Sequence, residues 1–162
     1  MTYRTTGSMT VQARSRVHDV STTWTKIVAE IEADPDAVEA AKATFTVDMT
    51  AFDAGDWLKN RKLRKDFALD QHPTATFTLD RVSGVVRDGA KFAATAEGTL
   101  RWRGKTVPLK LDGRGSLDAS HLSASASFEL DIKLLGLTAP KFFIVKMEDV
   151  VTVEVTLVGV AA

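Results

Sequence analysis

The sequence predicts an all-β protein whose strands form an extended, eight-stranded antiparallel barrel with one or two short helices. Apolar or small side chains alternate with polar ones over many segments, which is typical of strands that bury one face. Hairpin-type turns such as Asp88-Gly89 separate several of these segments, so neighbouring strands are expected to pair antiparallel. A length of 162 residues suits one substantial core. We therefore expect a single domain over residues 1–162.

The alternation places the strands in order along the chain. It first appears from Met9 to Val17 and recurs over six later segments, at 44–51, 74–86, 92–102, 107–117, 122–134 and 151–157. Residues 21–33 complete the set but are ambiguous, because four apolar residues there also have helical spacing: Trp24, Ile27, Val28 and Ile31. A strand is the favoured interpretation of 21–33.

Two short helices are expected to interrupt these strands. Residues 35–41 follow Asp34, a suitable N-cap, and begin with Pro35, which is favoured at the first helical position. Residues 56–65 begin with an acidic residue and end with basic ones, which suits the helix dipole.

Composition argues against several classes of function. The 21 basic and 21 acidic residues cancel, so no overall field favours nucleic acid as a partner. The chain has no cysteine, and His18, His72 and His121 lack the short spacings of zinc sites, so no metal site is expected. Neither a nucleophile elbow nor a paired acid and base is evident, so we expect no enzyme. No cofactor is expected from these residues.

The N-terminal residues contain no apolar run typical of a secretory leader. The sequence as written therefore predicts a cytoplasmic protein, or a periplasmic one if a leader has been removed.

The inward faces of the expected strands do not decide whether the barrel interior is hollow or filled. The late strands run for about 11 to 13 residues, so each would span roughly 40 Å. Their inward faces mix bulky side chains with small ones, among them Ala94, Ala96, Gly98, Gly113, Gly115, Ala124 and Ala126. Small side chains leave space for a narrow ligand if they lie at one level, but they also interdigitate with bulky ones in a filled barrel. Alternation alone favours neither.

Several motifs resemble the YceI-like family, a lipocalin-like group described as polyisoprenoid-binding. The most specific are Asp53-Ala54-Gly55-Asp56, Leu63-Arg64, Asp66-Phe67 and His72-Pro73-Thr74-Ala75-Thr76-Phe77, followed by Gly98-Thr99-Leu100, Gly104-Lys105-Thr106 and Val107-Pro108-Leu109. Lys59-Asn60 stands where the family has Arg-Asp, and His72 where an aromatic residue is usual. The resemblance implies an eight-stranded barrel with an apolar tunnel that holds a polyprenyl or similar lipid chain.

We therefore hypothesise a carrier or storage protein for a polyisoprenoid, an isoprenoid quinone or a similar lipid. The residues expected to bind the chain are Ala13, Val17, Trp24, Phe45, Val47, Met49, Phe77, Phe92, Ala94, Ala96, Leu100, Trp102, Leu109, Leu111, Ala126, Phe128 and Leu130. Those expected at the mouth, near the head group, are His18, Arg64 and His72. The alternative is a filled, ligand-free barrel that acts as a protein-interaction domain.

The basic segment 59–65 raises two further expectations about partners. It could touch a membrane surface transiently, but a solvated helix with Trp57 and Phe67 tucked under the barrel end is the favoured interpretation. A homodimer is also considered.

Overall fold

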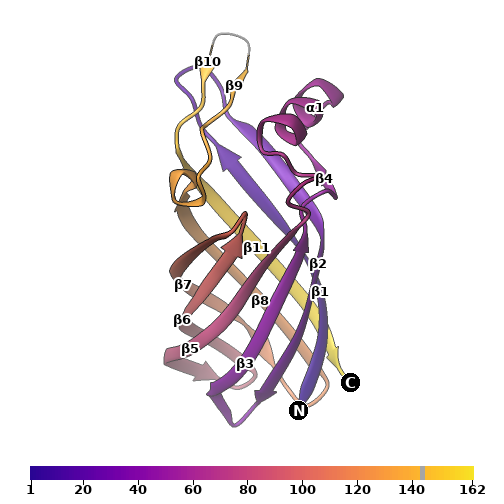
Figure 1. Cartoon of the computed structure of the whole chain (residues 1–162). Helices are drawn as coiled ribbons and strands as arrows, with labels where there is room; N and C mark the ends of the chain where they lie inside the picture. The colour runs from indigo at the N-terminus through magenta and orange to yellow at the C-terminus, as the bar shows by residue number, and fades with distance from the viewer. Residues whose placement is uncertain (143–144) are drawn as a thin grey trace.

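A computed structural model of the chain describes residues 1–142 and 145–162 and shows a closed antiparallel β-barrel (Figure 1). The strands that form the barrel are β1 (Thr2–Ala13), β2 (Val20–Asp34), β3 (Ala37–Asp48), β5 (Thr74–Asp88), β6 (Lys91–Trp102), β7 (Lys105–Leu117), β8 (His121–Asp131) and β11 (Val150–Ala161). The sheet closes because β1 pairs with β2 on one side and with β11 on the other. The predicted eight-stranded antiparallel barrel is confirmed.

The remaining elements gather at one end of the barrel. They are β4 (Phe52–Asp53), α1 (Trp57–Asp66), the 3₁₀ turn η1 (Ile132–Leu135), and a small hairpin of β9 (Lys141–Phe142) and β10 (Val145–Lys146). Both chain termini lie at the opposite end (Figure 1). We call these two ends the α1 end and the terminal end.

Most predicted strands agree with the structure, and the ambiguous segment 21–33 is a strand. Inward and outward positions alternate along β2 because β1 and β3 pair with it on either side, and this pairing overrides the helical spacing. The first strand is displaced, since β1 begins at Thr2 and ends at Ala13, so Val17 lies in the loop that follows. The strand expected over 122–134 ends at Asp131, and η1 follows.

The helix predicted over 35–41 is wrong. Pro35 and Asp36 form a tight turn between β2 and β3, and Ala37 already belongs to β3. The Asp34 carboxylate accepts a hydrogen bond from the Asp36 amide at 2.8 Å, which is a local turn contact. Aspartate followed by proline serves a turn as well as a helix start, so the local signal could not separate the two.

The second predicted helix is confirmed as α1. Asp56 is its N-cap, and its carboxylate accepts a hydrogen bond from the Lys59 amide at 2.8 Å. This bond lowers the pKa of Asp56 below its ordinary value. The Asn60 side chain accepts a hydrogen bond from the Ala54 amide at 2.5 Å and so fixes the segment that leads into the helix.

The barrel interior is divided into two apolar clusters. The cluster at the terminal end is closely packed around buried Tyr3, Ile31, Leu117 and Leu122. The Tyr3 hydroxyl donates to the Asp118 carbonyl at 2.5 Å, so this buried polar group has a partner. The cluster at the α1 end is larger and includes residues of α1 and η1. Buried side chains thus pack the interior at the terminal end, and residues of α1 and η1 join the cluster at the other end.

Candidate ligand-binding cavity

An apolar cavity of about 210 Å³ lies inside the barrel at the α1 end. Among the residues that line it, only Thr76 is neither aliphatic, aromatic nor methionine. The lining residues are Met9, Val11, Trp24, Ile27, Phe45, Val47, Met49, Phe67, Ala75, Thr76, Phe77, Leu100, Trp102, Leu109, Leu111, Ala126, Phe128, Leu130, Ile132, Leu135, Leu137, Val151, Val153 and Val155. Such a surface offers apolar burial and no charge to a ligand.

The floor of the cavity is an aromatic pair. The rings of Phe45 and Phe77 lie 5.8 Å apart and both border the cavity, while Phe45 also packs against the cluster at the terminal end. The closely packed residues beneath this pair limit how deep a ligand can reach. The cavity therefore occupies only the α1 half of the barrel.

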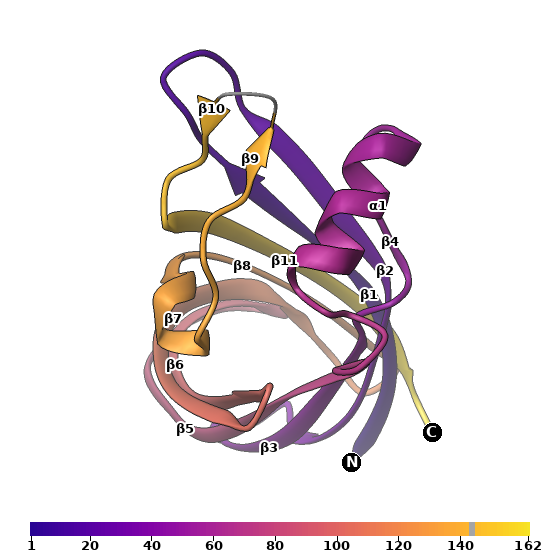
Figure 2. The same cartoon turned by 45° about the horizontal axis from the view of Figure 1, so that its top comes forward.

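The rim of the cavity is built by segments that cross the barrel end. Phe67, the C-cap of α1, lines one side, and the 132–137 segment lines another through Ile132, Leu135 and Leu137. Figure 2 shows α1 and the 132–142 segment on opposite sides of the barrel opening. The cavity is partly open, so this end forms its mouth.

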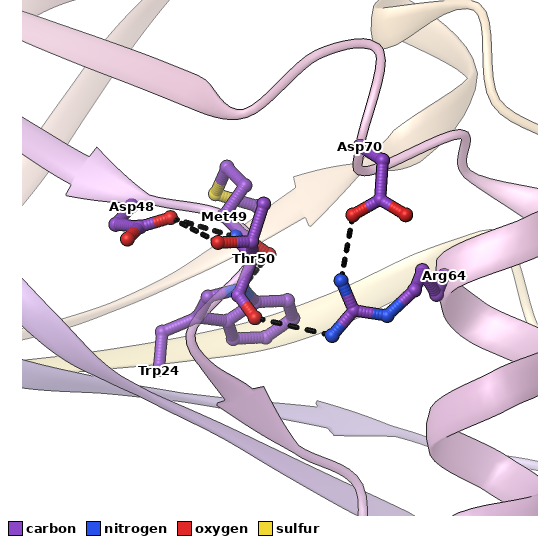
Figure 3. Close-up of polar contacts among 6 residues, drawn as sticks. All are labelled: Trp24, Asp48, Met49, Thr50, Arg64 and Asp70. Carbon is purple, nitrogen blue, oxygen red and sulfur yellow. Dashed lines mark hydrogen bonds and ion pairs between the residues drawn. The ribbon is translucent and has the colours of Figure 1, made fainter.

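Two buried indoles belong to the cavity wall, and both have partners for their N–H groups. Trp24 Nε1 donates to the Met49 carbonyl at 3.2 Å, a pair drawn in Figure 3. Trp102 Nε1 donates to the His72 carbonyl at 2.8 Å. Because each N–H is satisfied within the wall, neither indole needs a polar atom from a ligand.

Arg64 is held in the wall of the mouth by three contacts. Its guanidinium donates to the Asp70 carboxylate at 2.7 Å and to the Thr50 carbonyl at 3.3 Å (Figure 3), and it lies 5.2 Å from the centre of the Phe52 ring. The Thr50 turn is itself fixed, because the Asp48 carboxylate accepts from the Thr50 hydroxyl at 2.6 Å, which lowers the pKa of Asp48. Arg64 thus ties α1 to the barrel rim.

The other two residues predicted at the mouth lie in different segments. His72 is half-buried in the loop that leads to β5, and its backbone carbonyl accepts the Trp102 bond. His18 lies in the loop between β1 and β2, where its carbonyl accepts from the Ser15 hydroxyl at 2.5 Å. For both histidines, the described contacts involve the main chain.

Many of the residues predicted to bind a ligand do line the cavity. These are Trp24, Phe45, Val47, Met49, Phe77, Leu100, Trp102, Leu109, Leu111, Ala126, Phe128 and Leu130. Except for Met49, which lies in the turn after β3, they lie on β2, β3, β5, β6, β7 and β8. The alternation had indicated the inward positions on these strands, apart from that of Trp24. The structure therefore brings this part of the predicted set together around one space.

Five predicted residues do not line the cavity. Ala13 packs against the cluster at the α1 end, and Phe92 packs against the cluster at the terminal end. Ala94 and Ala96 follow Phe92 on β6, outside the cavity lining. Val17 is 73% exposed, because β1 ends before it.

Among the small inward residues, Ala126 lines the cavity, whereas Gly98 and Gly115 serve close packing. A Cβ atom added to Gly98 would collide with the Phe77 ring, and one added to Gly115 would collide with the Ser123 carbonyl. These glycines allow close approach of neighbouring groups. The interdigitated packing that the sequence left open is therefore the right description at both glycines, and the cavity is bounded mainly by bulky side chains.

Sequence reasoning missed the lining residues contributed by the rim and by β11. Val151, Val153 and Val155 alternate clearly in the sequence, so that signal was available. Phe67 was expected under the barrel end but not as a lining residue. Leu135 had no signal in the sequence, because it ends η1 and reaches the cavity only through the tertiary fold.

A wider hollow of about 620 Å³ lies at the terminal end, along the β5–β6 hairpin, β7, β8 and β11. It is more open to solvent than the interior cavity, and Asp88, Lys91 and Arg114 are among its lining residues. Over residues 1–142 and 145–162, no group of three or more His, Asp or Glu side chains is placed to hold a metal ion. In the same ranges, no helix has the length and apolarity needed to cross a membrane. The interior cavity is the best candidate site.

Comparison with protein families decides what kind of domain this is. The model of the YceI-like domain matches residues 4–159, almost the whole chain. The chain belongs to the YceI-like family. No curated protein matches the sequence at a significant level.

Solved structures share the YceI-like fold over nearly their full length. Burkholderia cenocepacia BcnA has a TM-score of 0.79 at 19% identity, with 94% of this chain and 95% of that chain covered. A polyisoprenoid-binding domain from Saccharophagus degradans, implicated in plant cell wall breakdown, has a TM-score of 0.74 at 14% identity, with 99% and 98% covered. The Campylobacter jejuni YceI protein has a TM-score of 0.73 at 17% identity, with 92% and 89% covered.

Proposed function

We propose that this protein binds the apolar end of an isoprenoid or similar lipid chain in the interior cavity and acts as a non-enzymatic carrier or storage protein. The observation that carries the proposal is the cavity itself, which is apolar on all sides and whose two wall indoles are already hydrogen-bonded. The similarity to a polyisoprenoid-binding domain supports the same class of ligand.

The size of the cavity limits what it takes in. A cavity of about 150 Å³ holds one benzene molecule, which is roughly 25 Å³ per carbon atom. On that scale the 210 Å³ cavity holds about eight carbon atoms, close to two isoprene units. The buried cluster around Tyr3, Leu117 and Leu122 opposes deeper entry, so the rest of a longer chain, with its head group, stays at the mouth between α1 and η1.

Affinity then comes from apolar burial and selects the shape of the chain end. Each buried CH₂ group contributes about 0.8 kcal/mol, so eight would contribute roughly 6 kcal/mol before the cost of association is subtracted. No lining residue is charged, so discrimination among head groups would have to arise at the rim.

Native mass spectrometry of the protein, purified without detergent from the cells that make it, tests the proposal. The expected result is a co-purifying apolar molecule that organic extraction removes. A clean apo mass, together with no uptake of added apolar chains, would favour the filled, ligand-free interaction domain.

A homodimer and the cellular location stay predictions. Sedimentation velocity of the purified protein checks whether it is a homodimer.

A further inference from the structure

The outward face of α1 carries two large apolar side chains. Trp57 is 67% exposed and Leu58 is 58% exposed, whereas Leu63 on the opposite side of the helix is buried in the barrel end. The expectation that Trp57 would be tucked under the barrel is wrong. The helix instead packs through Leu63 and the residues beside it, and it leaves its first turn in solvent.

Three basic side chains share this face. Residues four apart lie one above the other on a helix, so Arg61 and Lys65 continue the row of Trp57, and Lys62 continues that of Leu58. The Lys62 ammonium lies 2.9 Å from the Asp66 carboxylate. Both side chains are partly exposed, so this ion pair contributes little to stability. We call the set Trp57, Leu58, Arg61, Lys62 and Lys65 the outer face of α1.

Basic residues gather on α1, although the chain is neutral overall. Helix α1 (Trp57–Asp66), at the α1 end, contains five basic residues and one acidic residue, Asp66. Residues 28–42, which form the β2–β3 hairpin at the terminal end, contain five acidic residues and one basic one (Figure 1). An anionic surface would therefore attract α1 and repel the β2–β3 hairpin, which favours an orientation with the mouth forward.

We infer that the outer face of α1 docks on an anionic lipid bilayer and presents the cavity mouth to it. Basic residues attract anionic head groups, and tryptophan and leucine beside them suit the boundary between head groups and acyl chains. Charge complementarity and the position of this face at the rim both favour a lipid surface. The inference rests on the proposed function in one respect: docking would let an apolar chain pass between the bilayer and the cavity.

The test uses the intact protein with vesicles of equal phosphatidylglycerol and phosphatidylcholine, and with vesicles of phosphatidylcholine alone. A triple variant, Arg61→Gln, Lys62→Gln and Lys65→Gln, removes the charge but keeps good helix formers. A control variant, Lys42→Gln, Lys91→Gln and Lys110→Gln, removes the same charge from exposed positions away from α1.

Co-sedimentation is expected for wild type and control with the anionic vesicles only, and to weaken as salt is raised. Each basic residue near an anionic surface contributes about fivefold to partitioning, so the α1 variant should lose roughly 100-fold. Equal binding to both vesicle types, equal loss in both variants, or no binding by wild type would overturn the inference.

Tryptophan fluorescence reports which surface makes the contact. Trp24 and Trp102 are buried and Trp57 is exposed, so a blue shift on addition of anionic vesicles should come from Trp57 and vanish in Trp57→Phe. A shift that persists in Trp57→Phe would contradict the proposed orientation. Binding of a short alkanol in solution should be the same in wild type and in the α1 variant. Failure of the docking inference is thereby distinguished from failure of the proposed function.

Discussion

Replacing Ala126 by Phe should abolish binding of an apolar chain while the barrel stays folded. Ala126 lies on β8 and lines the cavity. The added phenyl ring is the size of benzene, which fills a cavity of about 150 Å³, so it would occupy most of the 210 Å³ available. Room for about two carbon atoms would remain, at roughly 25 Å³ each.

The loss of binding follows from the burial that is no longer available. About six carbon atoms lose their site, and at about 0.8 kcal/mol each this weakens binding by roughly 5 kcal/mol, or several thousandfold. The cost to folding should stay within about 1 to 3 kcal/mol, because the ring enters existing space.

Calorimetric titration with 1-octanol measures this effect, and urea unfolding checks stability. Ser127→Phe is the matched control, because the neighbouring position on the same strand points outwards and is exposed. Binding should be lost in Ala126→Phe and retained in Ser127→Phe. Undiminished binding in a folded Ala126→Phe variant would refute the assignment of the cavity as the site.

Two further predictions concern the buried cluster at the terminal end and the helix cap. Tyr3→Phe should lower the free energy of unfolding in urea by about 1 to 2 kcal/mol, because the Asp118 carbonyl loses its buried donor; an unchanged value would contradict that role. The pKa of Asp56 is lowered chiefly by the Lys59 amide, so its stabilising effect is full above its unfolded pKa and is lost as pH falls through the lower, folded value. Asp56→Asn keeps an N-cap but cannot ionise, so its unfolding midpoint should depend less on pH in this acidic range; an identical acid profile would contradict the assignment.

The barrel could be predicted from the sequence because the two-residue alternation of inward and outward side chains recurs along most of the chain. Side chains in a strand alternate between faces, and a closed sheet buries one of these faces along every strand. The hairpin turn predicted at Asp88-Gly89 was equally clear: it joins β5 to β6, and Gly89 has the positive φ, 61°, that such a turn favours. Both signals depend on residues adjacent in sequence.

The predictions that were wrong depended on information that is not local. Asp34-Pro35 starts a turn because β3 pairs directly with β2, and Val17 is exposed because β1 ends early. The cavity position also escaped prediction. It lies where Phe67 and the 132–137 segment cross the barrel end, whereas Gly98 and Gly115 serve close packing.

A chain-length series tests the central claim, that a short apolar cavity closed at one end binds the end of a lipid chain. The measurement is calorimetric titration of the protein with straight-chain 1-alkanols of about 4 to 16 carbon atoms. The cavity predicts that affinity rises about fourfold with each CH₂ group up to about eight carbon atoms and then levels off. No binding at any length, or a rise that continues to the longest chain, would contradict the account.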